Sequence, residues 1–185
     1  MKIILRHIYI CFLFLGFSVL AQNTVIKHYG VSQGLPSSET YYVTQDSKGY
    51  LWIATDAGVV KYDGYQFKTY TTADGLPDNT VFKIHEDKYG RVWFSSYSGR
   101  FAYYSHKTDS VYSIKANEKL TSIVKTLPLD FIFDAKDTLY VSVDRKGYLK
   151  IYPPNYEVVK SYQYVTNCLF VKQIDKNNFL YGKSF

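Results

Sequence analysis

The densest group of titratable side chains in the sequence is the run His85-Glu86-Asp87. Such a group could bind a metal ion or transfer protons in acid–base catalysis. Consecutive side chains of a strand point to opposite faces of the sheet, so an extended chain keeps His85 and Glu86 apart. The other histidines lack metal-ligand spacing, and no serine lies in a nucleophile-elbow sequence. We therefore expect that this chain is not an enzyme and holds neither a metal ion nor a cofactor.

Aromatic side chains are the second group that could contact a ligand, since they make up 18% of the chain and include two tryptophans. Trp52 and Trp93 could each offer a stacking surface to a sugar. They occupy, however, the same place in two similar segments. A residue that recurs with a repeat serves the scaffold, whereas a residue that differs between copies is free to specify a ligand. We therefore assign both tryptophans to the repeat core.

Several other segments recur at the spacing that separates Trp52 from Trp93, which we call the repeat spacing. A third, degraded copy includes Asp134, and a fourth includes Asp175, one repeat spacing after Asp134. Many matches at one spacing indicate an internal repeat. The matched pairs of the first two copies are Gly34-Leu35-Pro36-Ser37 with Gly75-Leu76-Pro77-Asp78, Asp46-Ser47-Lys48-Gly49 with Asp87-Lys88-Tyr89-Gly90, and Gly58 with Gly99.

Each repeat unit contains four short segments with strand character, separated by turn residues. In the first unit these are strand a (40–45), strand b (50–55), strand c (59–62) and strand d (65–70). Asp46, and Asp87 in the second unit, cap the turn from a to b, and Asp63-Gly64 forms the hairpin from c to d. Strand b is apolar on both faces, which places each sheet between two others.

Four antiparallel strands per repeat, with sheets packed face to face, predict an all-β protein made of β-propeller blades. The units lie near 29–70, 70–112, 113–160 and 161–185, so that about three and a half blades are present. A propeller needs about four to eight blades, and the fourth unit stops at Phe185, just after its strand b. We therefore expect an incomplete propeller, either part of a longer protein or, as the alternative, a chain that borrows blades by oligomerising.

The segment 1–21 has the pattern of a secretory signal peptide. Lys2 and Arg6 precede an apolar run from Ile8 to Leu20, and we expect cleavage between Ala21 and Gln22. The mature segment, residues 22–185, would then be the N-terminal part of a periplasmic propeller. It keeps one cysteine and therefore has no internal disulfide. Its basic and acidic residues are interspersed, which does not indicate nucleic-acid binding.

Ligand-binding candidates are the positions at which the copies differ. The turns a–b and c–d lie on one face of a propeller, and the loops b–c and d–a lie on the other face, where they are longer and more varied. At matched positions Asp56 is replaced by Tyr97, and Val59 is replaced by Arg100. Asp56, Tyr97 and Arg100 are therefore the candidate ligand-binding residues.

The repeated motif resembles the two-component regulator propeller repeat. The resemblance rests on Gly34-Leu35-Pro36-Ser37, on residues 46–55 and on Gly58-Val59-Val60-Lys61-Tyr62-Asp63-Gly64. It is close over residues 29–70, good to Tyr112 and faint beyond. In that family the repeats form the periplasmic sensor region of membrane histidine kinases, including hybrid ones.

The resemblance implies a ligand-sensing segment of a two-component signalling protein, with a small-molecule or glycan-derived ligand. The implied partners are the remaining blades, the membrane kinase portion of a parent protein anchored in the inner membrane, and a possible second copy in a homodimer. Two alternatives remain at this point. One is an exported propeller enzyme that acts on glycans, and the other is a structural or adhesive propeller.

Overall fold

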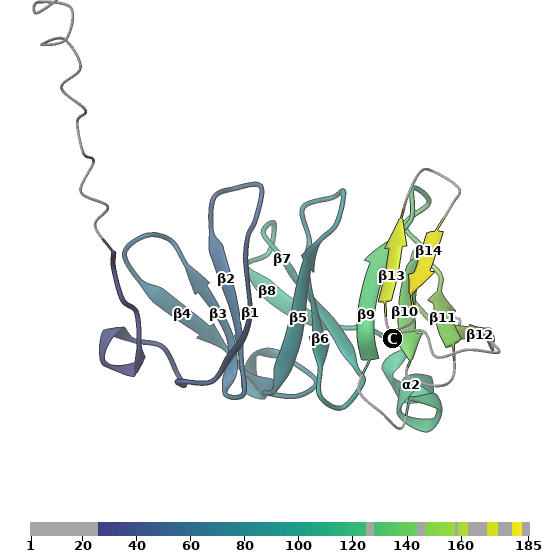
Figure 1. Cartoon of the computed structure of the whole chain (residues 1–185), viewed down its shortest axis with the longest axis horizontal. Coiled ribbons are helices and arrows are strands. Elements are labelled where there is room, and N and C mark those ends of the chain that lie inside the picture. The colour runs from purple at the N-terminus through teal and green to yellow at the C-terminus, as the bar shows by residue number, and fades with distance from the viewer. Residues whose placement is uncertain are drawn as a thin grey trace, which may run out of the picture.

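The computed structural model describes residues 26–124, 128–143, 147–157, 159–162, 170–173 and 179–182. Residues 1–25, which include the expected signal peptide and the Ala21–Gln22 cleavage position, lie outside this part. The described chain forms three four-stranded antiparallel sheets and one two-stranded sheet, each in sequential strand order (Figure 1). The prediction of an all-β protein with four-stranded blades and an incomplete propeller is confirmed. No helix of the described part is long and apolar enough to cross a bilayer.

The strands of the first two sheets lie close to their expected positions. Blade 1 contains β1 (Thr40–Gln45), β2 (Leu51–Thr55), β3 (Gly58–Tyr62) and β4 (Phe67–Tyr70). Blade 2 contains β5 (Val81–Glu86), β6 (Val92–Ser96), β7 (Phe101–Ser105) and β8 (Ser110–Ser113). Blade 3 contains β9 (Pro128–Phe133), β10 (Leu139–Val143), β11 (Gly147–Ile151) and β12 (Val159–Tyr162), and a last pair contains β13 (Phe170–Gln173) and β14 (Phe179–Gly182).

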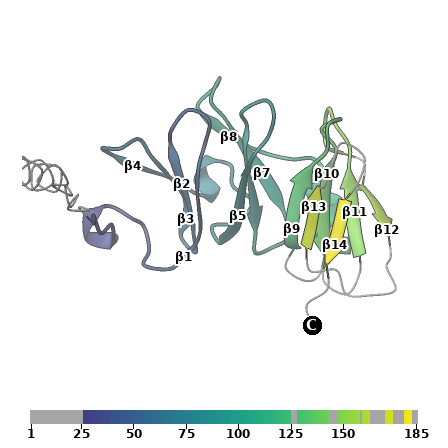
Figure 2. The ribbon, with the colours of Figure 1, turned by 45° about the horizontal axis from the view of Figure 1, so that its top comes forward.

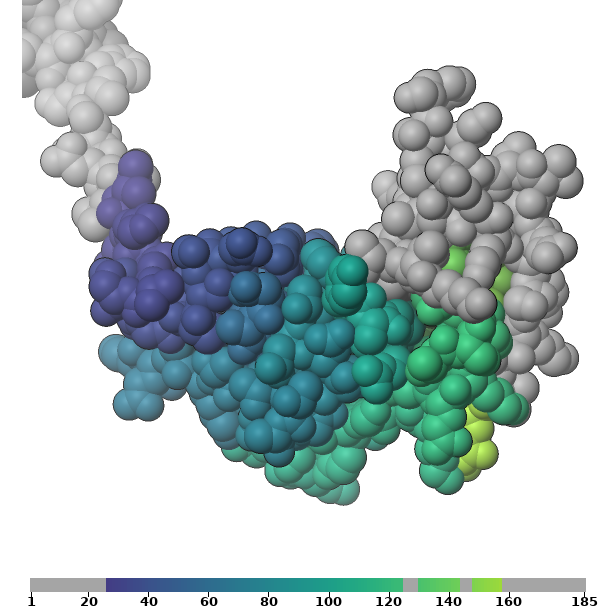
Figure 3. Space-filling model, turned by 90° about the horizontal axis from the view of Figure 1, so that it is seen from below, coloured from purple at the N-terminus to yellow at the C-terminus, as the bar shows by residue number. Residues whose placement is uncertain are grey.

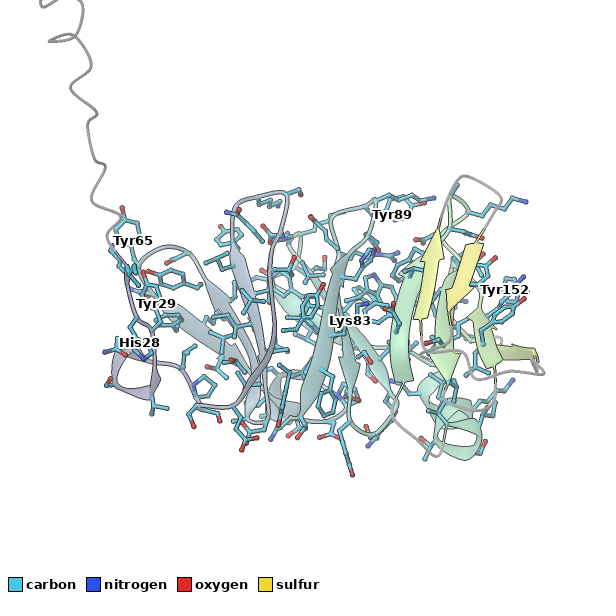
Figure 4. The ribbon with its side chains drawn as sticks, in the orientation of Figure 1. His28, Tyr29, Tyr65, Lys83, Tyr89 and Tyr152 are labelled. Atoms are coloured by element: carbon cyan, nitrogen blue, oxygen red, sulfur yellow. The ribbon has the colours of Figure 1, made fainter. Side chains whose placement is uncertain are left out.

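The sheets follow one another in a curved array, with the first strand of each at the inner edge. Strand β1 contacts β5, and β9 contacts β13. The described residues bend as an arc when the array is seen along its strands (Figure 3), and the tilted view separates successive sheets (Figure 2). Lys83 on β5 pairs with Asp130 on β9, which ties two inner strands together (Figure 4). The array therefore has the geometry of consecutive propeller blades.

Apolar side chains fill the spaces between the blades. One cluster joins the facing sides of blades 1 and 2, and another joins those of blades 2 and 3. All of β6 is buried, as expected for a strand that lies between two other sheets. Trp52 and Trp93 are both 0% exposed, each at the centre of one interface. Neither ring is therefore available for stacking against a ligand.

An aspartate holds each tryptophan in place. Asp46 Oδ1 accepts hydrogen bonds from the backbone N–H groups of Lys48 and Tyr50, while Oδ2 accepts the indole N–H of Trp52 at 2.7 Å. Asp87 makes the same contacts, with the Trp93 indole N–H also at 2.7 Å. One carboxylate thus closes the a–b turn and satisfies the buried indole donor.

The third blade keeps this arrangement with a different aromatic residue. Asp134 Oδ1 accepts the N–H groups of Lys136 and Thr138, and its Oδ2 accepts the hydroxyl of Tyr140 at 3.2 Å. A phenol therefore replaces the indole while the buried donor keeps its acceptor. The pairing of turn carboxylate and aromatic donor persists in a copy whose sequence has otherwise diverged.

The connections between the blades differ more than the strands do. Two short 3-10 helices, η1 (Val31–Gln33) and η2 (Thr72–Asp74), precede the Gly-Leu-Pro segments, whose leucines are buried. The connection into blade 3 holds α2 (Asn117–Ile123) instead. The sequence did not predict this helix. It accounts for part of the extra length between Asp87 and Asp134, which are farther apart in the chain than Asp46 and Asp87.

The two glycines of the b–c loops occupy different structural positions. Gly58 pairs directly with Thr55, and a Cβ atom there would lie 2.4 Å from the carbonyl oxygen of Tyr70. Gly99 has φ +73 and lies one residue before the corresponding strand position. The matching of Gly58 with Gly99, and of Val59 with Arg100, is therefore wrong. Strand pairing sets Arg100 at the Gly58 position, since blade 2 has one more loop residue.

The side of blade 1 that faces away from blade 2 is partly open. Leu35, Ile53, Val60 and Phe67 form a small cluster there, and Tyr29 from the N-terminal segment packs on Phe67. Figure 4 shows His28, Tyr29 and Tyr65 at this end of the array. Val43 is 57% exposed, whereas Ile84, at the same repeat position in blade 2, is 1% exposed. Among the described residues, no sheet covers this side of blade 1 as blade 1 covers blade 2.

Candidate functional site

The candidate residues Asp56, Tyr97 and Arg100 lie in the b–c loops of adjacent blades. Asp56 follows β2, and Tyr97 and Arg100 lie between β6 and β7. These loops are on the face opposite to the a–b turns, the face on which α2 also lies (Figure 1). Tyr89, by contrast, lies in the a–b turn of blade 2 on the other face (Figure 4). The two faces of the array therefore expose different tyrosines of the same blade.

Thr80 connects the two b–c loops. Its hydroxyl donates to the backbone carbonyl of Asp56 at 3.3 Å, and its own carbonyl accepts the N–H of Tyr97 at 2.8 Å. Thr80 directly precedes β5, so the loops of blades 1 and 2 are fixed to the same strand end. The structure thereby brings Asp56 and Tyr97, which lie one repeat spacing apart in the sequence, to one surface.

Asp78 holds the longer loop of blade 2. Its two carboxylate oxygens accept the N–H groups of Thr80 at 3.1 Å and Ser98 at 3.2 Å. The Ser98 hydroxyl accepts the Nε–H of Arg100 at 3.1 Å. Within the described residues, no carboxylate forms an ion pair with Arg100. The guanidinium is thus positioned by the loop, and no carboxylate in the described part of the chain neutralises its charge.

A row of aromatic rings lies next to these loops. Tyr41 and Phe82 are 4.7 Å apart between ring centroids, and Phe82 and Tyr97 are 6.1 Å apart. Tyr41 is 39% exposed and Tyr97 is 60% exposed. Aromatic rings that remain accessible in a row can stack against the apolar faces of a ligand. The row therefore extends the candidate surface from the b–c loops to the inner strands.

The rings of the inner strands come from β-bulges. The pairing of β1 with β2 skips Tyr41, and the pairing of β5 with β6 skips Phe82. Strand β9 has its own irregularity at the corresponding Leu129. Bulges redirect side chains and are frequent beside binding sites. The sequence did not reveal Tyr41 and Phe82 as candidates, because residues recurring at the repeat spacing were assigned to the scaffold. Both copies have an aromatic residue at this position of a partly exposed strand, and that recurrence could have identified them as candidates.

The charges around the row differ between its two ends. Near blade 1, the Tyr41 hydroxyl donates to Glu39 at 2.8 Å, and this hydrogen bond raises the pKa of Tyr41 above its ordinary value. Asp56 Oδ1 is shielded from solvent and has no hydrogen-bond partner among the described residues. Near blade 2, Arg100 supplies a positive charge. The surface therefore offers acceptors, a cationic donor and ring faces, which suits a polar ligand with apolar faces.

The cluster His85-Glu86-Asp87 is divided among three environments. The His85 ring stacks on Phe133 of blade 3 at 5.8 Å. Glu86 accepts the backbone N–H and the hydroxyl of Ser47 in blade 1 at 2.7 and 2.6 Å. Asp87 caps its own turn. No group of three metal-binding side chains occurs in the part of the chain that the structure describes. The three residues thus join and shape blades rather than form one site.

The burial of His85 predicts a pH dependence of stability. Burial lowers the pKa of His85, so the folded chain binds fewer protons here than the unfolded chain does. This stabilisation is complete above the unfolded pKa of about 6.5 and is lost as the pH falls from there through the lower pKa of the folded state. Urea unfolding should show a lower free energy at pH 5.5 than at 7.5, and His85→Leu should reduce the difference.

The matched control is the exposed His28, whose replacement by Leu should leave the pH dependence unchanged. His106, whose pKa burial also lowers, accounts for a remaining part of the slope in the His85→Leu variant. An unchanged pH dependence in His85→Leu would contradict this assignment.

Comparison with known proteins gives a consistent result. Residues 34–57 and 75–98 match the model of the two-component regulator propeller family. Over 61 residues the chain is 41% identical to histidine kinase P4 of Formosa agariphila, and the match covers 32% of this chain and 4% of that protein. The matched family segments run from the Gly-Leu-Pro turns into the b–c loops of blades 1 and 2.

Two solved structures from B. thetaiotaomicron share the fold. The extracellular domain described for the putative hybrid two component system BT3049 superimposes with a TM-score of 0.67 at 19% identity, covering 84% of this chain and 23% of that one. That of BT4673 gives 0.60 at 24% identity, covering 77% and 21%. The chain thus spans less than a quarter of these domains. Two segments of the chain, residues 34–57 and 75–98, are thus similar to two-component regulator propeller repeats, and they lie on a fold shared with these two domains.

Proposed function

We propose that this chain is part of the extracytoplasmic sensor propeller of a two-component signalling protein. The family match supports this assignment, and so do the structural neighbours, which are extracellular domains of hybrid two-component systems. In this proposal residues 1–21 direct export to the periplasm. Further blades complete the propeller, and a membrane-anchored histidine kinase portion of the parent protein converts ligand binding into phosphorylation.

The observation that carries the proposal is the surface formed by the b–c loops and the bulged rings. Its loops are fixed by hydrogen bonds between the backbone and the side chains of Thr80 and Asp78, whereas Tyr97 and Arg100 keep their ring face and charge accessible. Positions that differ between copies on a constant scaffold are suited to ligand recognition. A small molecule or glycan fragment bound here would contact two blades at once, and a second copy of the protein could respond in a dimer.

The test compares two exposed tyrosines of blade 2. Tyr97 is 60% exposed on the proposed ligand face, and Tyr89 is 64% exposed on the opposite face. Neutral and acidic disaccharides are titrated calorimetrically against the parent protein. Tyr97→Ala should weaken the affinity of the bound sugar by about tenfold, which is about 1.4 kcal/mol, and should shift kinase output to higher ligand concentration. Tyr89→Ala should change neither. Equal effects of the two variants would refute this location.

A further inference from the structure

A cavity lies at the joint between blades 1 and 2. Its volume is about 390 Å³, and its wall is lined by Tyr50, Lys61, Asp63, Gln66, Phe67, Lys68 and Asp109. The Asp63 carboxylate accepts the backbone N–H groups of Tyr65 and Gln66 in its own turn. A volume of this size is within the range of small-ligand sites. It is lined from the a–b and c–d turns, so it is separate from the proposed ligand surface on the b–c loops.

The cavity wall carries an ammonium group with unused donors. Lys61 Nζ donates to the Tyr104 hydroxyl at 2.8 Å and lies 4.1 Å from the centroid of the Tyr50 ring. Its nearest carboxylate oxygen, on Asp109, is 3.9 Å away. The side chain is 13% exposed, and burial lowers its pKa. An ammonium has three donors, so two of the Lys61 donors have no hydrogen-bond acceptor among the described residues.

Asp109 supplies the counter-charge from the next blade. It accepts hydrogen bonds from Lys68 Nζ at 2.8 Å and from the Tyr104 hydroxyl at 2.6 Å. These donors lower the pKa of Asp109 to about 2. Its carboxylate is 59% exposed, so it remains charged and borders the opening. One carboxylate thus faces two ammonium groups that sit opposite each other on β3 and β4.

We propose that this cavity binds a small organic carboxylate, with the ligand carboxylate on Lys61 and Lys68 and its body against Tyr50. Lys61 donates to the Tyr104 hydroxyl and Lys68 to Asp109, and a ligand carboxylate would supply charge-assisted acceptors for their remaining donors. The Tyr50 ring offers a flat apolar surface, which suits a ligand with a planar or apolar group next to its carboxylate. The ligand would bridge strands of blade 1 and the c–d turn of blade 2, so its binding would stabilise that joint.

The test uses 4-fluorobenzoate and its uncharged isostere 4-fluorobenzamide, observed by fluorine NMR line broadening with the full chain. Benzoate should bind with a dissociation constant of about 1 to 10 mM, and benzamide should bind at least about tenfold more weakly. Lys61→Met keeps the stem of the side chain, removes the charge and should weaken benzoate binding by about tenfold. Lys107→Met, at an exposed lysine outside the cavity wall, should leave it within about twofold.

Asp109→Asn should increase benzoate binding, a result that misfolding of the variant cannot produce. Asp109 has φ +49, a conformation that asparagine also adopts. The loss of the competing carboxylate should tighten benzoate binding by about three- to tenfold. The proposal is overturned if benzamide binds as well as benzoate, if Lys61→Met binds like the wild type, if Asp109→Asn binds more weakly, or if no binding occurs at about 20 mM. None of these outcomes depends on the sugar titration at Tyr97.

Discussion

Replacing Trp93 by alanine should lower the free energy of unfolding by about 3 to 5 kcal/mol, the range measured for large aromatic residues in cores. Trp93 is fully buried between blades 2 and 3, where its ring contacts Tyr103, Phe133 and Tyr156 at centroid distances of 5.0, 4.9 and 4.8 Å. The variant also leaves an oxygen of Asp87 without its indole donor. Urea unfolding followed by circular dichroism measures the change.

Blade 3 suggests the conservative control. Tyr140 occupies the tryptophan position there, and its hydroxyl reaches the turn aspartate. Trp93→Tyr should therefore cost about 1 to 2 kcal/mol, less than the alanine variant, because the donor is kept and the volume loss is smaller. The exposed Tyr97→Ala should change stability by less than about 0.5 kcal/mol. Equal losses for Trp93→Tyr and Trp93→Ala would contradict the role assigned to the Asp87 hydrogen bond.

The second large effect on stability is expected at the repeat position that Ile84 holds in blade 2 and Val43 holds in blade 1. Ile84→Lys places a charge at a site that is 1% exposed between blades 1 and 2. Burial of an unpaired charge should cost about 4 kcal/mol or more, enough to unfold blade 2. Val43 holds the same position in blade 1 but is 57% exposed. In this chain Val43→Lys should change stability by less than about 0.5 kcal/mol. Thermal unfolding of the two purified variants measures the difference.

Three features of the sequence were sufficient to predict the blades. Alternating turn and strand residues set the strand limits. The recurrence of the tryptophan position marked the interior, and Asp46 and Asp87 marked the a–b turns. Each of these signals is local, because turn geometry and strand pairing join residues that are close in the sequence. The sequence therefore predicted the architecture of blades 1 and 2 closely.

The remaining features depend on contacts between blades or on single-residue insertions. Gly58 and Gly99 are identical residues at the repeat spacing, yet one extra loop residue in blade 2 gives them different positions. The ties of Ser47 to Glu86 and of Lys61 to Tyr104 join different blades, and residue spacing alone does not predict such side-chain pairs. Tyr41 and Phe82 were missed because a bulge, which the sequence does not mark, leaves a repeated position partly exposed.

As the central claim, we propose that this array is one part of a larger propeller in a signalling protein, with a further blade against the open side of blade 1. The direct test is Val43→Lys in the longer parent protein, measured by thermal unfolding beside Ile84→Lys. If a blade covers Val43 there as blade 1 covers Ile84, both variants should lose about 4 kcal/mol or more. If Val43→Lys in the parent is as stable as the wild type, no blade covers this side and the claim is wrong.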